Sequence, residues 1–186
     1  DNRDDSTIPR LISVLDQEDV VYRRAAVKAL GFIGMDTVPP LVEALLNSEN
    51  VTVRGSAAKA LAQVVINYPD DAFPEIGLQG LKTAIADPNP VVHIGAIMAL
   101  GQMGTTAFDI LVEALKSTDN IAVQVAIVNA LSSLGDDRCK EILASFANDE
   151  TVDPYVRESA TSSLSRLDLV MNYERKSWSL NCWPLN

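Results

Sequence analysis

The chain has 186 residues, of which 47% are hydrophobic, and it carries a formal net charge of −10 at pH 7. This negative net charge argues against nucleic acid as the main partner and against binding to an anionic membrane surface, because both carry negative charge themselves. No apolar run approaches the ~20 residues of a membrane-spanning helix, so we expect no membrane insertion.

An internal repeat organises the sequence. Five copies share an apolar helical pattern centred on an Ala-Leu pair (Ser-Leu in the last copy), and the pair recurs at steps of roughly 30–40 residues. The copies occupy residues 20–34, 51–65, 90–104, 121–135 and 154–168. Self-similarity with this period predicts a solenoid, in which each repeat buries its apolar face on its neighbours.

Each copy is preceded by a second apolar stripe with i, i+3, i+4, i+7 spacing, which is typical of a helix with one buried face. A short polar turn joins the two stripes, and its Asp, Asn or Ser side chains can cap the helix that follows. No segment alternates with period two. We therefore predict a single all-α domain, residues 1–186, built from helical hairpins. The expected repeats span about 6–34, 35–68, 73–104, 105–135 and 136–168, followed by a tail at 169–186.

A helical wheel centred on the anchor alanine predicts which rows of each second helix are buried. The buried stripe contains the anchor, the leucine after it, the residue three before it, and the residue seven before it. The last of these rows comprises Tyr22, Val53, Val92, Val123 and Val156. The row four before the anchor holds only small residues, which we expect to let the next helix approach closely. These are Ala25, Ser56, Gly95, Ala126 and Ser159.

An arginine stands six residues before the anchor in three repeats, at Arg23, Arg54 and Arg157, between an acidic or amide turn and an A-x-x-A-L-G-like helix. This arrangement, over about residues 8–168, resembles the HEAT-like repeats of the phycobilisome-lyase type. The resemblance implies a right-handed α-solenoid of five HEAT-like hairpins, in which a turn aspartate and the arginine brace one another. His93 and Gln124 replace the arginine, so we expect different bracing there. We expect His93 to brace its own turn, with a ligand or acid/base role as the alternative.

The exposed rows of the second helices predict a binding surface. Positions five before, one before and two after each anchor lie opposite the buried stripe and are expected to line a concave face. This face begins basic, becomes apolar and uncharged in the middle, and ends polar. An exposed apolar patch on an acidic protein is typical of a binding site. The predicted partner-binding residues are Arg24, Lys28, Lys59, Ile94, Met98, Val125 and Asn129.

The sequence contains no glycine-rich phosphate loop, no H-E-x-x-H, no G-x-S-x-G and no cluster of metal ligands. From the residues we therefore predict a non-catalytic scaffold, adaptor or assembly factor that binds a protein partner on its concave face, without a cofactor or metal. The resemblance implies an alternative: a bilin-handling protein like a phycobilin lyase subunit or a phycobilisome-degradation factor. A tetrapyrrole would then occupy the apolar centre, with its propionates at the basic rim. A second HEAT-like subunit would be needed for lyase activity.

The cysteines and the first residue bear on the compartment. Cys139 falls on a buried stripe and is expected to be an inert thiol. For Cys182, in the tail, an incidental residue and a reactive or modified thiol are the alternatives. Because no paired spacing indicates a disulfide, a reducing intracellular compartment fits best, and the resemblance implies a cyanobacterial cytoplasm or a plastid stroma. No signal or transit peptide is recognised, and because the chain opens with Asp1 we expect a processed or excised form.

Two segments depart from the repeat. The extra residues at 66–73 are expected to form an irregular junction, with a partner-binding finger as the alternative.

The tail contains both tryptophans, Trp178 and Trp183. It is expected to fold back over the fifth repeat as a cap, because the last hairpin of a solenoid exposes an apolar flank. The alternative is an aromatic docking segment for a partner.

Overall fold

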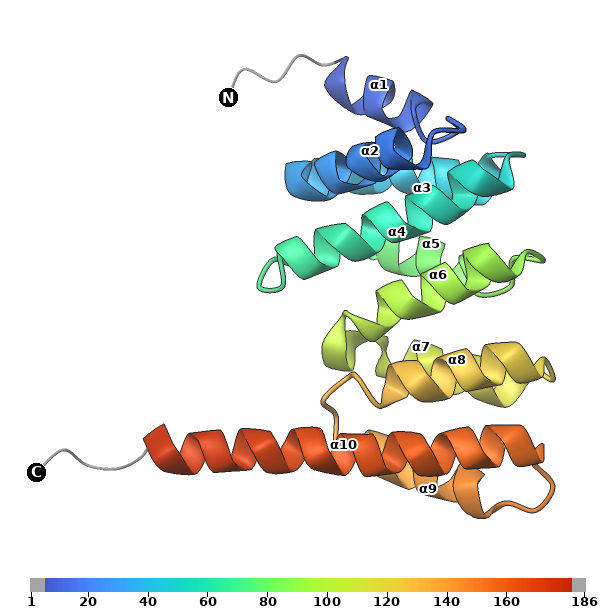
Figure 1. Ribbon diagram of the computed structural model, residues 1–186, viewed down its shortest axis with the longest axis vertical. Helices are drawn as coiled ribbons and strands as arrows, with labels where there is room; N and C mark the ends of the chain where they lie inside the picture. Colours follow the sequence, from blue (N-terminus) through green and yellow to red (C-terminus); the bar gives the residue numbers. More distant parts are fainter. Residues whose placement is uncertain (1–5, 182–186) are drawn as a thin grey trace, which may run out of the picture. The chain divides into compact units, whose positions relative to one another are not determined.

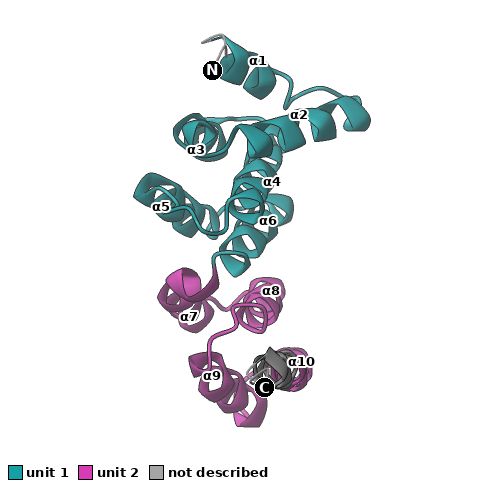
Figure 2. Ribbon diagram, turned by 90° about the vertical axis from the view of Figure 1, so that its left-hand side faces the viewer, with its two compact units in different colours: residues 1–103 teal, residues 104–186 magenta. Residues whose placement is uncertain are grey.

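The computed structural model describes residues 6–181, and beyond residue 169 it describes the helical backbone alone. The chain divides into two compact units, residues 1–103 and 104–186 (Figure 2). Each unit is built of stacked helical hairpins, and no strand occurs among residues 6–181. The predicted all-α class and α-solenoid architecture are confirmed. The single domain and the handedness of the solenoid stay predictions.

The first unit contains three hairpins. Their first helices are α1 (Thr7–Ser13), α3 (Val38–Asn47) and α5 (Glu75–Ala84), and their second helices are α2 (Val20–Ile33), α4 (Val51–Asn67) and α6 (Pro90–Gly101). A 3-10 helix, η1 (Met35–Thr37), leads into α3. Helix α2 packs on α4 and α4 packs on α6, while α3 packs on α5 (Figure 1). The second helices therefore form one layer of this unit and the first helices another.

The second unit contains two hairpins. It begins with the 3-10 helix η2 (Gly104–Ala107), followed by α7 (Phe108–Ser117), α8 (Ile121–Leu131), α9 (Arg138–Asn148) and α10 (Pro154–Asn181). Helix α10 packs on both α8 and α9. An ion pair of 2.8 Å between Lys140 Nζ and Asp168 Oδ1 joins α9 to α10.

Polar side chains in the turns begin the second helices, as predicted. At each start an Asp or Asn side chain accepts a hydrogen bond from a backbone N–H of the first turn, which would otherwise lack a partner. The residues are Asp19, Asn50, Asn89, Asn120 and Asp153. The five predicted second helices consequently begin at the predicted residues.

The core follows the predicted rows with one clear exception. The leucines after the first four anchors are fully buried, and every residue in the row three before the anchor is buried, with Ala26 the most exposed at 5%. In the row seven before, Val92, Val123 and Val156 are buried and Val53 is half-buried, but Tyr22 is 56% exposed. The prediction for Tyr22 is wrong because α1 has only seven residues and buries none of its own, so it leaves the start of α2 uncovered.

The residues six before the anchor share one structural role despite their different chemistry. Each of the first four reaches back to a backbone carbonyl of the preceding turn. Arg54 Nη1 donates to Ser48 O (3.0 Å), His93 Nδ1 lies 3.1 Å from Asp87 O, Gln124 Nε2 donates to Thr118 O (2.9 Å), and Arg23 donates to Gln17 O. The predicted bracing of its own turn by His93 is confirmed.

Arg54 also makes an ion pair between repeats. Its Nε lies 2.8 Å from Asp87 Oδ2 and its Nη2 lies 3.3 Å from Asp87 Oδ1, and both side chains are mostly buried. Burial raises the pKa of Asp87, but the hydrogen bonds from Arg54 and from the Asn89 N–H outweigh it and hold the pKa below its ordinary value. The arginine thus pairs with the aspartate of the next turn, in the third repeat.

The junction at residues 66–73 is held against the second helix of the first repeat. Helix α4 ends at Asn67, and the Tyr68 hydroxyl donates to Phe32 O at 2.5 Å. The Tyr68 ring also lies over Gly34, where an added Cβ would come within 3.0 Å of a ring carbon. These contacts favour the junction over the partner-binding finger.

The tail does not turn back over the fifth repeat within residues 169–181, which continue α10. That prediction is wrong because no proline or glycine interrupts the chain between Asp168 and Pro184, so the helix has no breaker there. The side chain of Trp178, and Trp183 as a whole, lie outside the described residues, and their docking role stays a prediction.

No single helix within residues 6–181 is both long enough and apolar enough to cross a membrane. One sharply bent pair, Val20–Ile33 with Met35–Asn47, meets that test when its two arms are taken together.

Candidate functional site

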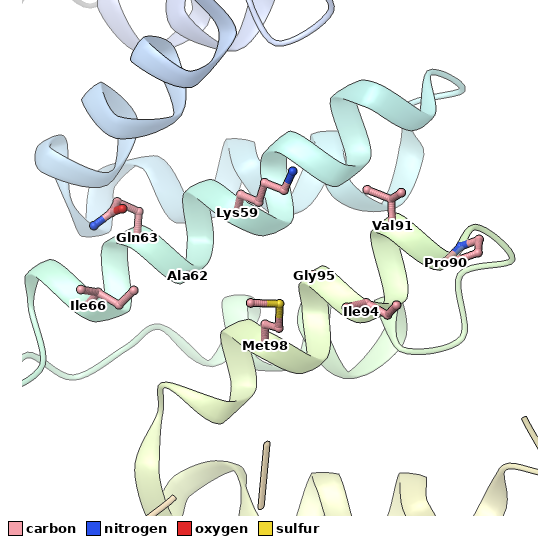
Figure 3. Close-up of a pocket in the computed structure, with 9 residues that line it drawn as sticks. All are labelled: Lys59, Ala62, Gln63, Ile66, Pro90, Val91, Ile94, Gly95 and Met98. Atoms are coloured by element: carbon pink, nitrogen blue, oxygen red, sulfur yellow. The ribbon is translucent and has the colours of Figure 1, made fainter. Parts of the chain in front are cut away.

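A groove of about 390 Å³ lies between the second helices α4 and α6 of the first unit (Figure 3). Each helix contributes four residues with i, i+3, i+4, i+7 spacing, so that two stripes face one another across the groove. The lining residues are Lys59, Ala62, Gln63 and Ile66 on α4, and Val91, Ile94, Gly95 and Met98 on α6, with Pro90 at one end. The volume falls within the ~300–1,000 Å³ usual for pockets that bind small molecules.

Small residues bring the two helices together beneath the groove. An added Cβ at Gly95 would lie 3.2 Å from the Cβ of Ala58, and one at Gly55 would lie 3.1 Å from Val91 Cγ1. At Gly95 the small row allows a close helix approach, as predicted, but the prediction that the next helix makes this contact is wrong there, because Gly95 of α6 faces Ala58 of the preceding second helix, α4. The larger side chains on either side of this contact form the walls of the groove.

The groove is apolar and partly open to solvent. Ile66 and Val91 are about half exposed, Met98 is 62% exposed, and Figure 3 shows Met98 and Val91 reaching from α6 toward α4. Methionine sulfur is polarizable and makes favourable contacts with aromatic rings. The lining is therefore suited to an apolar ligand, and Met98 could contact an aromatic ring of it.

Two side chains give the groove polar character. Gln63 Nε2 donates to Asn67 Oδ1 at 2.9 Å, while the Lys59 side chain is exposed. Among the residues that the structure describes, no carboxylate pairs with Lys59. The ammonium group is available to an anionic ligand.

The helices around the groove differ in charge from the protein as a whole. Helices α2, α4 and α6 contain no Asp or Glu, although the chain carries a net charge of −10. They contain five cationic residues, Arg23, Arg24, Lys28, Arg54 and Lys59. In the first unit the described acidic residues lie instead in the turns, in η1 and on the first helices, so the charged residues of its second helices are all cationic.

The structure brings together three of the seven predicted site residues. Lys59, Ile94 and Met98 line the groove, whereas Arg24 and Lys28 are exposed on α2 outside it. In the second unit, Val125 is half-buried, and the Asn129 Oδ1 accepts from Ser163 Oγ (3.2 Å) and from Arg166 Nη2 (3.4 Å). Partner binding by these seven residues stays a prediction.

Sequence reasoning missed five lining residues: Gln63, Ile66, Pro90, Val91 and Gly95. They lie outside the three rows that the wheel assigned to the concave face. Residues 59, 62, 63 and 66 on α4 and residues 91, 94, 95 and 98 on α6 each follow the i, i+3, i+4, i+7 spacing of one helix face. A search of the sequence for this spacing on the exposed faces would have found every missed residue except Pro90.

Comparison with known proteins assigns the family. A family model described as HEAT repeats matches residues 3–73 and 78–165. The chain belongs to the HEAT-repeat family. The predicted resemblance to repeats of the phycobilisome-lyase type is also confirmed, since the relatives and the solved structure below are similar over most of the chain.

Two relatives and one structure are similar along nearly the whole chain. The HEAT-repeat chain is 55% identical to the uncharacterized phycocyanin operon protein Z of Pseudanabaena tenuis (strain PCC 7409), over 94% of this chain and 87% of that protein. It is 33% identical to the bilin biosynthesis protein CpeZ of Synechococcus sp. (strain WH8020), over 89% and 92%. The complex of CpcE and CpcF of phycocyanin lyase from Nostoc sp. PCC7120 shares the fold, with a TM-score of 0.67, 19% identity, and coverage of 86% and 99%.

Other reactive groups of this HEAT-repeat protein are buried or dispersed. Within the described residues, no three His, Cys, Asp or Glu side chains gather as they would around a metal ion. Cys139 is fully buried in α9, where burial first and the nearby Asp136 second raise the pKa of its thiol to about 11. The reactive thiolate is therefore strongly disfavoured at neutral pH.

We expect Cys139 to resist alkylation in the folded protein. In a Cys182→Ser variant, which leaves Cys139 as the only thiol, maleimide labelling at pH 8 should be at least about 100-fold slower than in denaturant, because both burial and the raised pKa suppress attack. The reaction is followed by intact mass. Labelling at similar rates in the two conditions would contradict the inert thiol.

Proposed function

We propose that this HEAT-repeat protein is a bilin-handling subunit of the lyase type, which holds an open-chain tetrapyrrole in the groove between α4 and α6. The observation that carries the proposal is the combination of an apolar groove with an unpaired cation, Lys59, at its wall. A bilin has the matching chemistry, since its conjugated pyrroles are apolar and its two propionates are anionic. The similarity to a protein named bilin biosynthesis protein supports the same assignment.

In the proposed complex each part of the groove has one role. Ile94 and Met98 contact the faces of the pyrrole rings and exclude water from them. The Lys59 ammonium pairs with a propionate, and such a charge-assisted bond gains strength beside an apolar wall. Because the groove is open along one side, one edge of the pigment stays accessible to an acceptor protein.

A protein partner is part of the proposal. CpcE and CpcF of phycocyanin lyase were solved as a complex of two chains. We therefore propose that this chain works with a second HEAT-type subunit to deliver the bilin. The scaffold hypothesis predicts a different behaviour, in which the same surface binds an acidic protein partner and no pigment.

Pigment binding is tested by titrating the purified chain with biliverdin and with phycocyanobilin and recording the red absorbance band. Met98→Asp should weaken binding at least about tenfold, because it places a charge in the apolar wall. Ile76→Asp is the matched control: Ile76 is similarly exposed but lies on α5, outside the groove, and its replacement should leave binding unchanged.

The role of Lys59 is tested with the dimethyl ester of the pigment. Wild type should bind the free acid several-fold more tightly than the ester, and Lys59→Gln should remove this preference without preventing ester binding. If wild type binds neither pigment, or if Met98→Asp binds as well as wild type, the proposed function is wrong. Capture of an acceptor protein by a pigment-free chain would support the scaffold hypothesis instead.

A further inference from the structure

One thioether stands exposed in the wall of the groove. Met98 is 62% exposed, and Figure 3 shows its side chain between α6 and α4. Its apolar companions in the lining include Ile94 on α6 and Ile66 on α4. Peroxides oxidise methionine to methionine sulfoxide, which turns a flexible apolar side chain into a polar one. The groove therefore carries an oxidisable group on the surface that a ligand would contact.

The other sulfur atoms of the described side chains are less accessible. Met35 and Met103 are half-buried, and neither lines the groove. Cys139 is fully buried, and burial raises the pKa of its thiol, so the oxidisable thiolate is scarce at neutral pH. Among the side chains that the structure describes, Met98 is thus the sulfur that peroxide should reach first.

Oxidation at this position changes the chemistry of the groove without changing the fold. A lone pair of the sulfur attacks one peroxide oxygen, an S–O bond forms, the O–O bond breaks, and the second oxygen leaves as water with both peroxide protons. The sulfur gives up two electrons. The new sulfoxide oxygen is a strong hydrogen-bond acceptor that keeps its hydration when the groove is empty, and covering it with an apolar ligand costs free energy.

We propose that Met98 is a modification site at which peroxide reversibly switches the groove between a ligand-binding thioether form and a sulfoxide form that releases the ligand. A dithiol reductase of the methionine sulfoxide class reverses the change, because the oxygen leaves as water while the dithiol becomes a disulfide. The identity of the ligand rests on the proposed function, whereas the oxidation of Met98 does not.

The ligand and the oxidant compete for the same sulfur. A pigment that lies against Met98 shields the thioether from peroxide, so the occupied groove is protected and the empty groove is switched off. Met103 follows Met98 by five residues and lies outside the lining, so a pigment in the groove leaves it as accessible as before.

The first experiment maps oxidation in the full-length chain by hydrogen peroxide treatment, catalase quenching and peptide mass spectrometry. Met98 should gain its oxygen at least about fivefold faster than Met35 or Met103, because its side chain is the most exposed of the three. Saturating biliverdin should slow oxidation of Met98 several-fold and leave Met103 unchanged. The unchanged Met103 excludes simple consumption of peroxide by the pigment.

The second experiment measures biliverdin affinity by absorbance titration before and after oxidation, with the peroxide removed by catalase. Oxidised wild type should bind about tenfold more weakly, and treatment with methionine sulfoxide reductases A and B and dithiothreitol should restore the affinity. Met98→Leu, which conserves volume but has no sulfur, should bind like wild type and ignore peroxide. Met98→Gln should bind weakly with or without peroxide. Circular dichroism should show the same helix content throughout.

Each contrary result has a separate meaning. The switch is wrong if oxidised wild type binds biliverdin as tightly as reduced wild type, if peroxide weakens Met98→Leu equally, or if Met35 or Met103 is oxidised as fast as Met98. If reduced wild type binds no pigment at all, the proposed function fails, and the oxidation map alone then decides whether Met98 is the preferred modification site.

Discussion

Replacing Leu61 with alanine is expected to lower the free energy of unfolding by about 2–5 kcal/mol. Leu61 is fully buried in α4, the helix that packs on α2, α3 and α6 together. Truncation removes apolar contacts and leaves a cavity that three surrounding helices cannot all move to fill. The change is measured by urea denaturation followed by far-ultraviolet circular dichroism.

Leu169→Ala is the matched control for this experiment. The chemical change is identical and the residue is helical, but Leu169 is 71% exposed. We expect its replacement to change stability by no more than about 0.5 kcal/mol. Similar losses for the two variants would show that burial in the stack of second helices is not the source of the effect.

Replacing Arg54 with alanine is expected to lower the free energy of unfolding by about 1.5–3 kcal/mol, the usual range for hydrogen bonds to charged groups. The substitution removes two bonds to the Asp87 carboxylate and the bonds to Ser48 O and Glu49 O, and it leaves a mostly buried carboxylate without its cation. Arg24→Ala is the control, because Arg24 is exposed and has no ion-pair partner among the described residues.

The Arg54 contribution should depend on pH in one direction. The folded-state pKa of Asp87 is lowered, so its stabilising effect is present above the unfolded pKa of about 4 and is lost as pH falls through the lower folded value. The difference in the free energy of unfolding between wild type and Arg54→Ala should therefore be largest near pH 7 and should become smaller below pH ~4. A gap that stays constant down to pH 3 would exclude the ion pair as its cause.

Much of the fold could be predicted because its signals are local. The start of α8, for example, depends on Asn120 accepting N–H bonds and on Gln124 reaching the turn carbonyl, and both partners lie within six residues. The candidate groove was predicted only in part. Lys59 and Met98 fall on one wheel face, but their juxtaposition with Gln63 and Val91 depends on how α6 is placed along α4. That placement involves Gly95 against Ala58.

The sequence by itself determined the hairpin repeat, the helix starts and the buried leucines, because capping and apolar periodicity are properties of a single helix. Only the tertiary structure decided the groove, the ion pair between Arg54 and Asp87, which lie 33 residues apart, and the exposure of Tyr22 and Phe32. The physical reason is that burial and pairing depend on which neighbour covers a face. An identical helical pattern is core where another hairpin packs on it and surface where none does.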